Sequence, residues 1–152
     1  MIEVTLCEHE CKLAVAEGQY RRFLAIERHL HWQNGKDERS EERDSEAAAS
    51  EITVAKAFDR YPYSYFQGNP GGVDVSKDIE VKWTPRSNGC LLVKSKEISN
   101  PKHRYILVTG TMPNFILRGW AYGYEAQLDE WWRPEAQAYF FPQDRLHELR
   151  RR

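Results

Sequence analysis

Two carboxylates and one amine lie close together in the sequence, at Asp74, Glu80 and Lys82. From residue 73 to residue 83 apolar and polar side chains alternate, which predicts two short β-strands joined by a polar turn at 76–78. In that hairpin Asp74 lies opposite Glu80, and directly opposed side chains have Cβ atoms about 4.5–5.5 Å apart. Two carboxylates at this distance repel each other, so a divalent cation with oxygen ligands is the natural occupant of the space between them.

The same stretch has a simpler interpretation, in which the hairpin turns one polar face to solvent. Aspartate, glutamate and lysine are common on such faces, so the pattern alone leaves both interpretations open. They differ in whether further acidic groups converge on the hairpin within reach of one cation.

A third carboxylate, Glu51, lies in a predicted helix at about residues 45–58. It precedes Ala55 by one turn and Phe58 by two, which places it at the inward edge of the apolar face. It can therefore point into a site at the sheet, or it can be a boundary residue that reaches solvent.

The elements that would position these side chains form a mixed central β-sheet flanked by helices, an α/β (α+β) fold class. Residues 105–109 are apolar on both faces, which predicts a strand in the centre of the sheet. Residues 8–32 repeat apolar side chains at three- and four-residue steps, which predicts a helix. Further strands are predicted at residues 2–6, 90–93 and 115–124.

The strand at residues 115–124 carries a row of aromatic side chains on one face, which includes Trp120, Tyr122 and Tyr124. Such a row can stack nucleic-acid bases. Packing against a helix is the commoner role of an aromatic row, and we expect it here.

The composition is that of a globular protein, with 41% hydrophobic and 30% charged residues. The 152 residues predict a single domain, with a helical part at about residues 8–58 and a β-rich part at about residues 63–125. The sequence contains neither a long apolar run nor a signal-peptide pattern, so we expect no membrane partner and a cytoplasmic location. Three cysteines are too few for a disulfide framework, and Cys7 and Cys11 match no zinc motif.

The net charge of −1 hides an uneven distribution along the chain. Residues 77–104 carry seven Lys or Arg against three Asp or Glu, whereas residues 1–76 carry nine against 14. The positive segment begins in the turn of the hairpin, where a polyanion would approach the carboxylates.

A helix with an inward glutamate, a hairpin with an aspartate and a strand with Glu-x-Lys follow one another in this chain. This order resembles the PD-(D/E)xK nucleases, the restriction-endonuclease-like superfamily, and the residues that carry the resemblance are Glu51, Asp74, Glu80 and Lys82. Val73 stands where a proline often precedes the aspartate. Over most of its length the chain is also similar to an uncharacterised group of small phage and bacterial proteins, through residues 51–56, 73–75, 79–82, 106–110 and 115–120.

The resemblance implies a restriction-endonuclease-like core and a Mg²⁺- or Mn²⁺-dependent hydrolase that cuts the phosphodiester bonds of DNA. Asp74, Glu80 and the backbone carbonyl of Val81 would bind the metal, and Glu51 would be a further ligand, directly or through water. Lys82 would orient the attacking water and offset the charge of the phosphate. Four basic residues are candidates for contacts with the DNA backbone, namely Lys77, Arg86, Lys94 and Lys96.

Two other functions would use the same features differently. A nucleic-acid-binding module would keep the fold without turnover, and a phage structural or interaction protein would carry the acids only as a solvated face. Clustered acids favour the nuclease, because a purely binding role does not need them. For the nuclease we expect a location in a bacterial or phage-infected host cell, and a homo-oligomer in which two sites cut two strands is compatible with the sequence.

Overall fold

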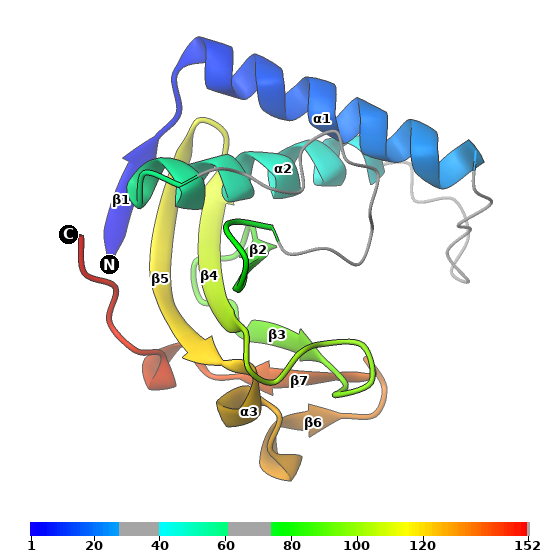
Figure 1. Cartoon of the computed structure of the whole chain (residues 1–152), viewed down its shortest axis with the longest axis vertical. Coiled ribbons are helices and arrows are strands. Elements are labelled where there is room, and N and C mark those ends of the chain that lie inside the picture. The colour runs from blue at the N-terminus through cyan, green and yellow to red at the C-terminus, as the bar shows by residue number, and fades with distance from the viewer. Residues whose placement is uncertain (28–39, 61–73, 152) are drawn as a thin grey trace.

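In the computed structural model, which describes residues 1–27, 40–60 and 74–151, the chain has the predicted mixed α and β architecture (Figure 1). The larger sheet has the strand order β1-β5-β4-β2 and the smaller sheet the order β3-β7-β6. Two long helices, α1 (Glu8–Glu27) and α2 (Ser40–Ala57), precede most of the strands. The other elements are β1 (Ile2–Thr5), β2 (Ile79–Thr84), β3 (Leu91–Lys94), β4 (Arg104–Thr111), β5 (Asn114–Tyr122), α3 (Gly123–Ala126), η1 (Asp129–Trp131), β6 (Trp132–Arg133), β7 (Ala138–Phe141) and η2 (Gln143–Arg145).

β4 is an inner strand of the larger sheet, which confirms the prediction from its apolar residues. It pairs antiparallel with β5 on one side and parallel with β2 on the other. All five side chains from Tyr105 to Thr109 are buried. β2 is the outermost strand at this end of the larger sheet, so one of its backbone edges faces away from β4.

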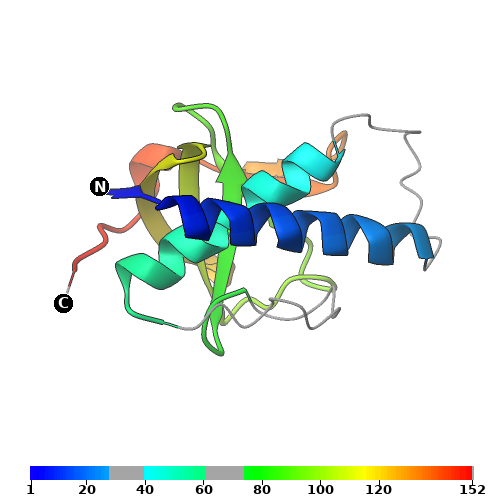
Figure 2. The same ribbon diagram turned by 90° about the horizontal axis from the view of Figure 1, so that it is seen from above.

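α2 lies between α1 and the larger sheet (Figures 1 and 2). The backbones of the two helices approach closely at Gly18, where a Cβ atom would lie 2.5 Å from the backbone nitrogen of Ser45. α2 begins five residues before the predicted start because Glu41 and Glu42 stabilise its first turn by their negative charge. Residues 28–32 of the predicted first helix lie outside the described residues.

Each face of the larger sheet has its own core. On one face, Ile106 and Val108 of β4 pack against apolar residues of α2 such as Ile52. On the other face, Tyr105 and Leu107 pack against the smaller sheet. Within residues 1–27, 40–60 and 74–151, no helix is both long and apolar enough to cross a bilayer.

The C-terminal tail returns across the larger sheet. His147 exchanges two backbone hydrogen bonds with Trp120 of β5, with N···O distances of 2.8 and 3.1 Å, and the two rings lie 4.7 Å apart. Further along, the Arg151 side chain donates a hydrogen bond to the carbonyl of Glu3. The tail therefore forms part of the surface beside β5, where the sequence predicted a helix as the packing partner of the aromatic row.

Candidate active site

Asp74 is brought to β2 by a tight turn. The predicted pairing of Val75 with Ile79 is present as an antiparallel bridge, and a left-handed backbone at Ser76 (φ 56°) closes the turn. The pairing stops there, and the Asp74 carboxylate turns to the outer edge of β2. Its Oδ2 accepts a hydrogen bond from the backbone N–H of Val81 at 2.7 Å.

Asp74 and Glu80 therefore do not pair as directly opposed strand residues, which differs from the prediction. The reason is that a backbone N–H at a sheet edge needs an acceptor, and Asp74 supplies one to β2. Val73, from the predicted first strand of the hairpin, lies outside the described residues.

Glu80 and Lys82 share one face of β2, since strand residues two apart point to the same side. In the parallel pairing with β4, Glu80 lies beside Tyr105 and Lys82 lies beside Leu107. The Nζ atom of Lys82 is 5.8 Å from the centre of the Tyr105 ring, which is within the range of a cation–π interaction. The amine therefore lies over the ring of the residue that pairs with Glu80.

Electrostatics link the four residues that carry the resemblance. Burial, followed by the negative charges of Glu51 and Glu80, raises the pKa of Asp74 well above its ordinary value. The Val81 N–H and the positive charge of Lys82 act in the opposite direction. Glu51, Glu80 and Lys82 therefore each lie within electrostatic reach of Asp74.

The same acidic groups act on Tyr105. Burial, together with the charges of Glu80 and Asp74, raises the pKa of Tyr105 to about 12. The phenol is consequently neutral at physiological pH, and its hydroxyl donates a hydrogen bond to the carbonyl of Asn100 at 3.1 Å. The uncharged Tyr105 side chain thus lies below Lys82 and beside Glu80 in the sheet.

Glu51 is buried in α2 and is held by an arginine that the sequence pattern did not reveal. Arg21 of α1 donates two hydrogen bonds to it, from Nη1 to Oε1 at 3.0 Å and from Nη2 to Oε2 at 2.6 Å. Arg21 also binds the buried Glu17 at 2.8 Å. Burial opposes the charge of Arg21, but the two carboxylates outweigh it and raise its pKa. The i, i+4 spacing of Glu17 and Arg21 was the only signal of this network in the sequence.

Glu80 is held by a second group of residues, which the sequence indicated only as a turn. The backbone N–H of Lys102 donates to Oδ1 of Asn100 at 2.9 Å, which turns the Asn100 amide nitrogen toward Nε2 of His103 at 3.2 Å. An acceptor role for Nε2 leaves the proton on Nδ1. Nδ1 of His103 then donates to Oε1 of Glu80 at 3.2 Å.

Hard oxygen ligands for a cation are present at the outer edge of β2. Oδ1 of Asp74 and Oε2 of Glu80 accept no hydrogen bond from a described residue. The N–H and C=O of a strand residue point to the same side, so the Val81 carbonyl lies on the edge that Asp74 occupies. Mg²⁺ commonly binds one or two carboxylates and keeps several waters, and this donor set suits it.

Glu51, the third carboxylate expected to bind the metal, is less available. Both oxygens of Glu51 accept hydrogen bonds from Arg21, which favours contact with a metal through water. Within residues 1–27, 40–60 and 74–151, no group of three or more His, Cys, Asp or Glu side chains is arranged so that it could hold a metal ion. The donors that fit Mg²⁺ are therefore Asp74, Glu80 and the Val81 carbonyl.

The four basic residues expected to contact DNA are exposed but lie in different places. Lys77 is in the turn beside Asp74. Lys94 ends β3, and Lys96 follows in the segment that leads to Asn100 and His103. Arg86 comes after the other end of β2, so the length of that strand separates it from Lys77.

Comparison with known proteins assigns no family to this arrangement. No family model matches the chain, and neither a curated protein nor a solved structure matches it. The interpretation of the site therefore depends on its geometry and chemistry.

The raised pKa of Asp74 predicts how stability depends on pH. Because the folded protein holds this proton more tightly than the unfolded chain, ionisation of Asp74 weakens folding as the pH rises through the raised pKa. Asp74→Asn removes the charge but keeps an oxygen for the Val81 N–H. In chelator at neutral pH we expect this variant to melt at a higher temperature, by about 2–4 °C for each kcal/mol gained.

The increase in melting temperature of Asp74→Asn over wild type should shrink as the pH falls toward about 4, where the aspartate of the unfolded chain is also protonated. Asp78→Asn is the matched control, because Asp78 lies in the same turn but pairs with Arg104 at 2.8 Å. Thermal unfolding of wild type, Asp74→Asn and Asp78→Asn across this pH range tests the predicted pH dependence of stability. A melting temperature of Asp74→Asn at or below that of wild type at neutral pH would contradict the interpretation.

Proposed function

We propose that the protein is a metal-dependent nuclease that hydrolyses phosphodiester bonds of DNA on a restriction-endonuclease-like core. The observation that supports this most is the partly buried Asp74 carboxylate near Lys82, whose pKa is raised by burial and by the charges of Glu51 and Glu80. Repulsion among neighbouring carboxylates destabilises the folded state unless a bound cation offsets their negative charge. Strongly perturbed groups with specific charged partners are typical of functional sites.

The arrangement of the elements supports the proposed core. The acidic helix α2 packs on the larger sheet, and the Glu-x-Lys strand β2 lies at the edge of that sheet, parallel to β4. One feature departs from the usual pattern, because the segment between β2 and β4 contributes β3 to the smaller sheet and forms no helix. The proposal therefore rests more on the site than on the topology.

Asp74, Glu80 and the Val81 carbonyl would hold the metal ion. Bound Mg²⁺ supplies a water of lowered pKa and offsets negative charge on the scissile phosphate. Lys82 orients the attacking water and stabilises charge that develops on the phosphate, aided by its position over the Tyr105 ring. Glu51, fixed by Arg21, accepts a hydrogen bond from water at the site. The exposed Lys77 contacts the DNA backbone next to the turn.

Substitution of the clustered residues tests the nuclease directly. We expect Asp74→Ala and Glu80→Ala to abolish metal-dependent cleavage of labelled DNA, and Lys82→Ala to lower the rate by about 10²–10³-fold. Glu97→Gln is the control, because Glu97 is exposed in the segment before His103 and has no role in the mechanism. Cleavage is measured on single-stranded, duplex and branched DNA with Mg²⁺, Mn²⁺ or chelator.

Folding of each variant is checked by thermal unfolding, so that loss of activity is not loss of structure. Equal rates for Asp74→Ala and wild type would reject the proposed site. No cleavage of DNA or RNA by the folded wild-type protein would favour a binding or structural role.

His103 is expected to position Glu80 through the Nδ1 proton that it donates at 3.2 Å. Loss of a residue that orients a metal ligand typically costs about 10–100-fold in metal affinity or activity. We expect His103→Ala to show this loss mainly as a higher Mg²⁺ concentration for half-maximal cleavage. Asparagine carries an N–H donor at the position of Nδ1, so His103→Asn should recover much of the loss. A Mg²⁺ requirement that is unchanged in His103→Ala would remove this role.

A further inference from the structure

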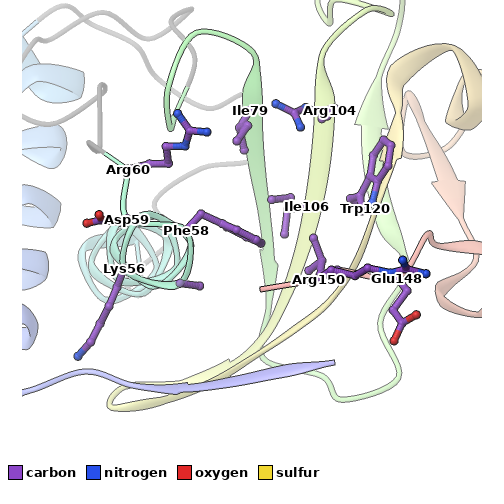
Figure 3. Close-up of a pocket in the computed structure, with 12 residues that line it drawn as sticks. Lys56, Phe58, Asp59, Arg60, Ile79, Arg104, Ile106, Trp120, Glu148 and Arg150 are labelled. Atoms are coloured by element: carbon purple, nitrogen blue, oxygen red, sulfur yellow. The ribbon is translucent and has the colours of Figure 1, made fainter. Parts of the chain in front are cut away.

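A cavity of about 590 Å³ lies on the α2 side of the larger sheet, away from the face that bears Glu80 and Lys82 (Figure 3). Its floor is formed by Ile79 of β2, Ile106 of β4 and Trp120 of β5. The end of α2 forms one wall, from which Phe58 points into the space, and the C-terminal tail with Leu149 forms another. The volume is typical of a small-ligand site, and the centre is apolar.

The rim of the cavity is positively charged. Arg60 and Arg104 hold their guanidinium groups at one end of it, and Arg150 extends along the opposite end (Figure 3). The two acidic rim residues, Asp59 and Glu148, direct their carboxylates away from the space. Arg60 and Arg150 are exposed and form no ion pair with a described residue, so both are available to an anion.

An aromatic row continues from the cavity along the same face of β5 and ends at Tyr124 in α3, because the strand predicted to reach residue 124 stops at Tyr122. The rings of Trp120 and Tyr122 are 5.0 Å apart, and those of Tyr122 and Tyr124 are 5.1 Å apart and stacked at 13°. Tyr124 ends the row with 54% of its surface exposed. Arg104 is the strand partner of Tyr122, but its guanidinium is paired with Asp78 at 2.8 Å, so Arg60 and Arg150 are the rim arginines available to an anion. The exposed end is open to stacking by another flat ring, which is the alternative role that the sequence left open.

We infer that the cavity and the aromatic row bind an unpaired segment of single-stranded DNA, with one base in the cavity and phosphates on Arg60 and Arg150. A nucleotide chain alternates flat apolar rings with anions, and this surface places an apolar floor between arginines and adds stacked rings beside it. Base stacking on aromatic side chains together with cations along the backbone is the general way in which proteins bind single strands. The inference rests on the proposed nuclease function and specifies its substrate.

The cavity and the acidic cluster share the same two strands. Ile79 lies on the cavity floor, and its neighbour Glu80 points to the opposite face of β2. Arg104 lines the cavity, while His103 before it contacts Glu80. Because β2 is the outermost of the described strands in this sheet, DNA bound in the cavity can reach the acidic cluster around this edge.

This arrangement favours DNA with an unpaired nucleotide next to the scissile phosphate. In a blunt duplex each base is inside the stack and enters a protein pocket only when it is flipped out, at the cost of its pairing and stacking. Single strands, overhangs and branch points do not carry this cost. The preferred substrate is therefore single-stranded or branched DNA.

Binding measured in chelator separates this inference from catalysis. The probe is a fluorescein-labelled oligothymidylate, and a blunt duplex of the same length is compared by fluorescence anisotropy. We expect Arg60→Gln and Arg150→Gln each to weaken single-strand binding by about three- to tenfold, and to reduce the salt dependence of log K by about 0.7 for each phosphate that the variant no longer neutralises. Arg133→Gln is the matched control, because Arg133 is exposed on β6 of the smaller sheet.

Photocrosslinking locates the bound strand. An oligonucleotide with 5-iododeoxyuridine, irradiated on wild-type protein in chelator, should attach to the peptide that carries Phe58, Trp120 or Tyr124. Crosslinks that map only elsewhere, equal losses in all three arginine variants, or duplex binding as tight as single-strand binding would each overturn the inference. If metal-dependent cleavage is observed together with any of these results, the proposed nuclease function is retained and only the proposed single-strand site is rejected. Specific single-strand binding in the cavity without cleavage would reject the nuclease instead.

Discussion

The Asp74 carboxylate at the outer edge of β2 is the constraint on which the candidate site depends. It accepts the N–H of Val81 at 2.7 Å and so satisfies a backbone donor on the outer edge of this strand. In this position its burial, together with the charges of Glu51 and Glu80, raises its pKa. The fold therefore places the Asp74 carboxylate where burial and neighbouring carboxylates make its ionisation unfavourable. A bound divalent cation would offset this repulsion.

Groups from distant parts of the chain hold the other two carboxylates in place. Arg21 of α1 binds both oxygens of Glu51, and the close approach of the helices at Gly18 brings α1 near enough for this contact. His103, oriented by Asn100, binds Glu80 from the start of β4. The acidic residues are thus fixed in orientation before any ligand arrives, which is the preorganisation that a catalytic site needs.

The strands and helices near the site were predictable because their patterns are local. Alternation along β2 and β5, the apolar run of β4 and the Val75–Ile79 pairing all follow from neighbouring residues. Arg21 and His103 were missed because their partners are 30 and 23 residues away, so only tertiary packing brings them together. The cavity was also hidden, since it needs the tail to cross β5 beside Trp120, which leaves no periodic signal.

The most direct measurement is the binding of Mn²⁺ to the protein at neutral pH, followed by electron paramagnetic resonance, in wild type and in Asp74→Asn. Free Mn²⁺ gives a sharp signal that bound Mn²⁺ lacks, so the titration reports binding without any substrate. If the acidic cluster is a metal site, wild type should bind Mn²⁺ and competing Mg²⁺ should release it. Asp74→Asn should bind at least about tenfold more weakly, a difference of about 1.4 kcal/mol. Equal binding by the two proteins, or none by wild type, would contradict the assignment of this edge of β2 as a metal-dependent active site.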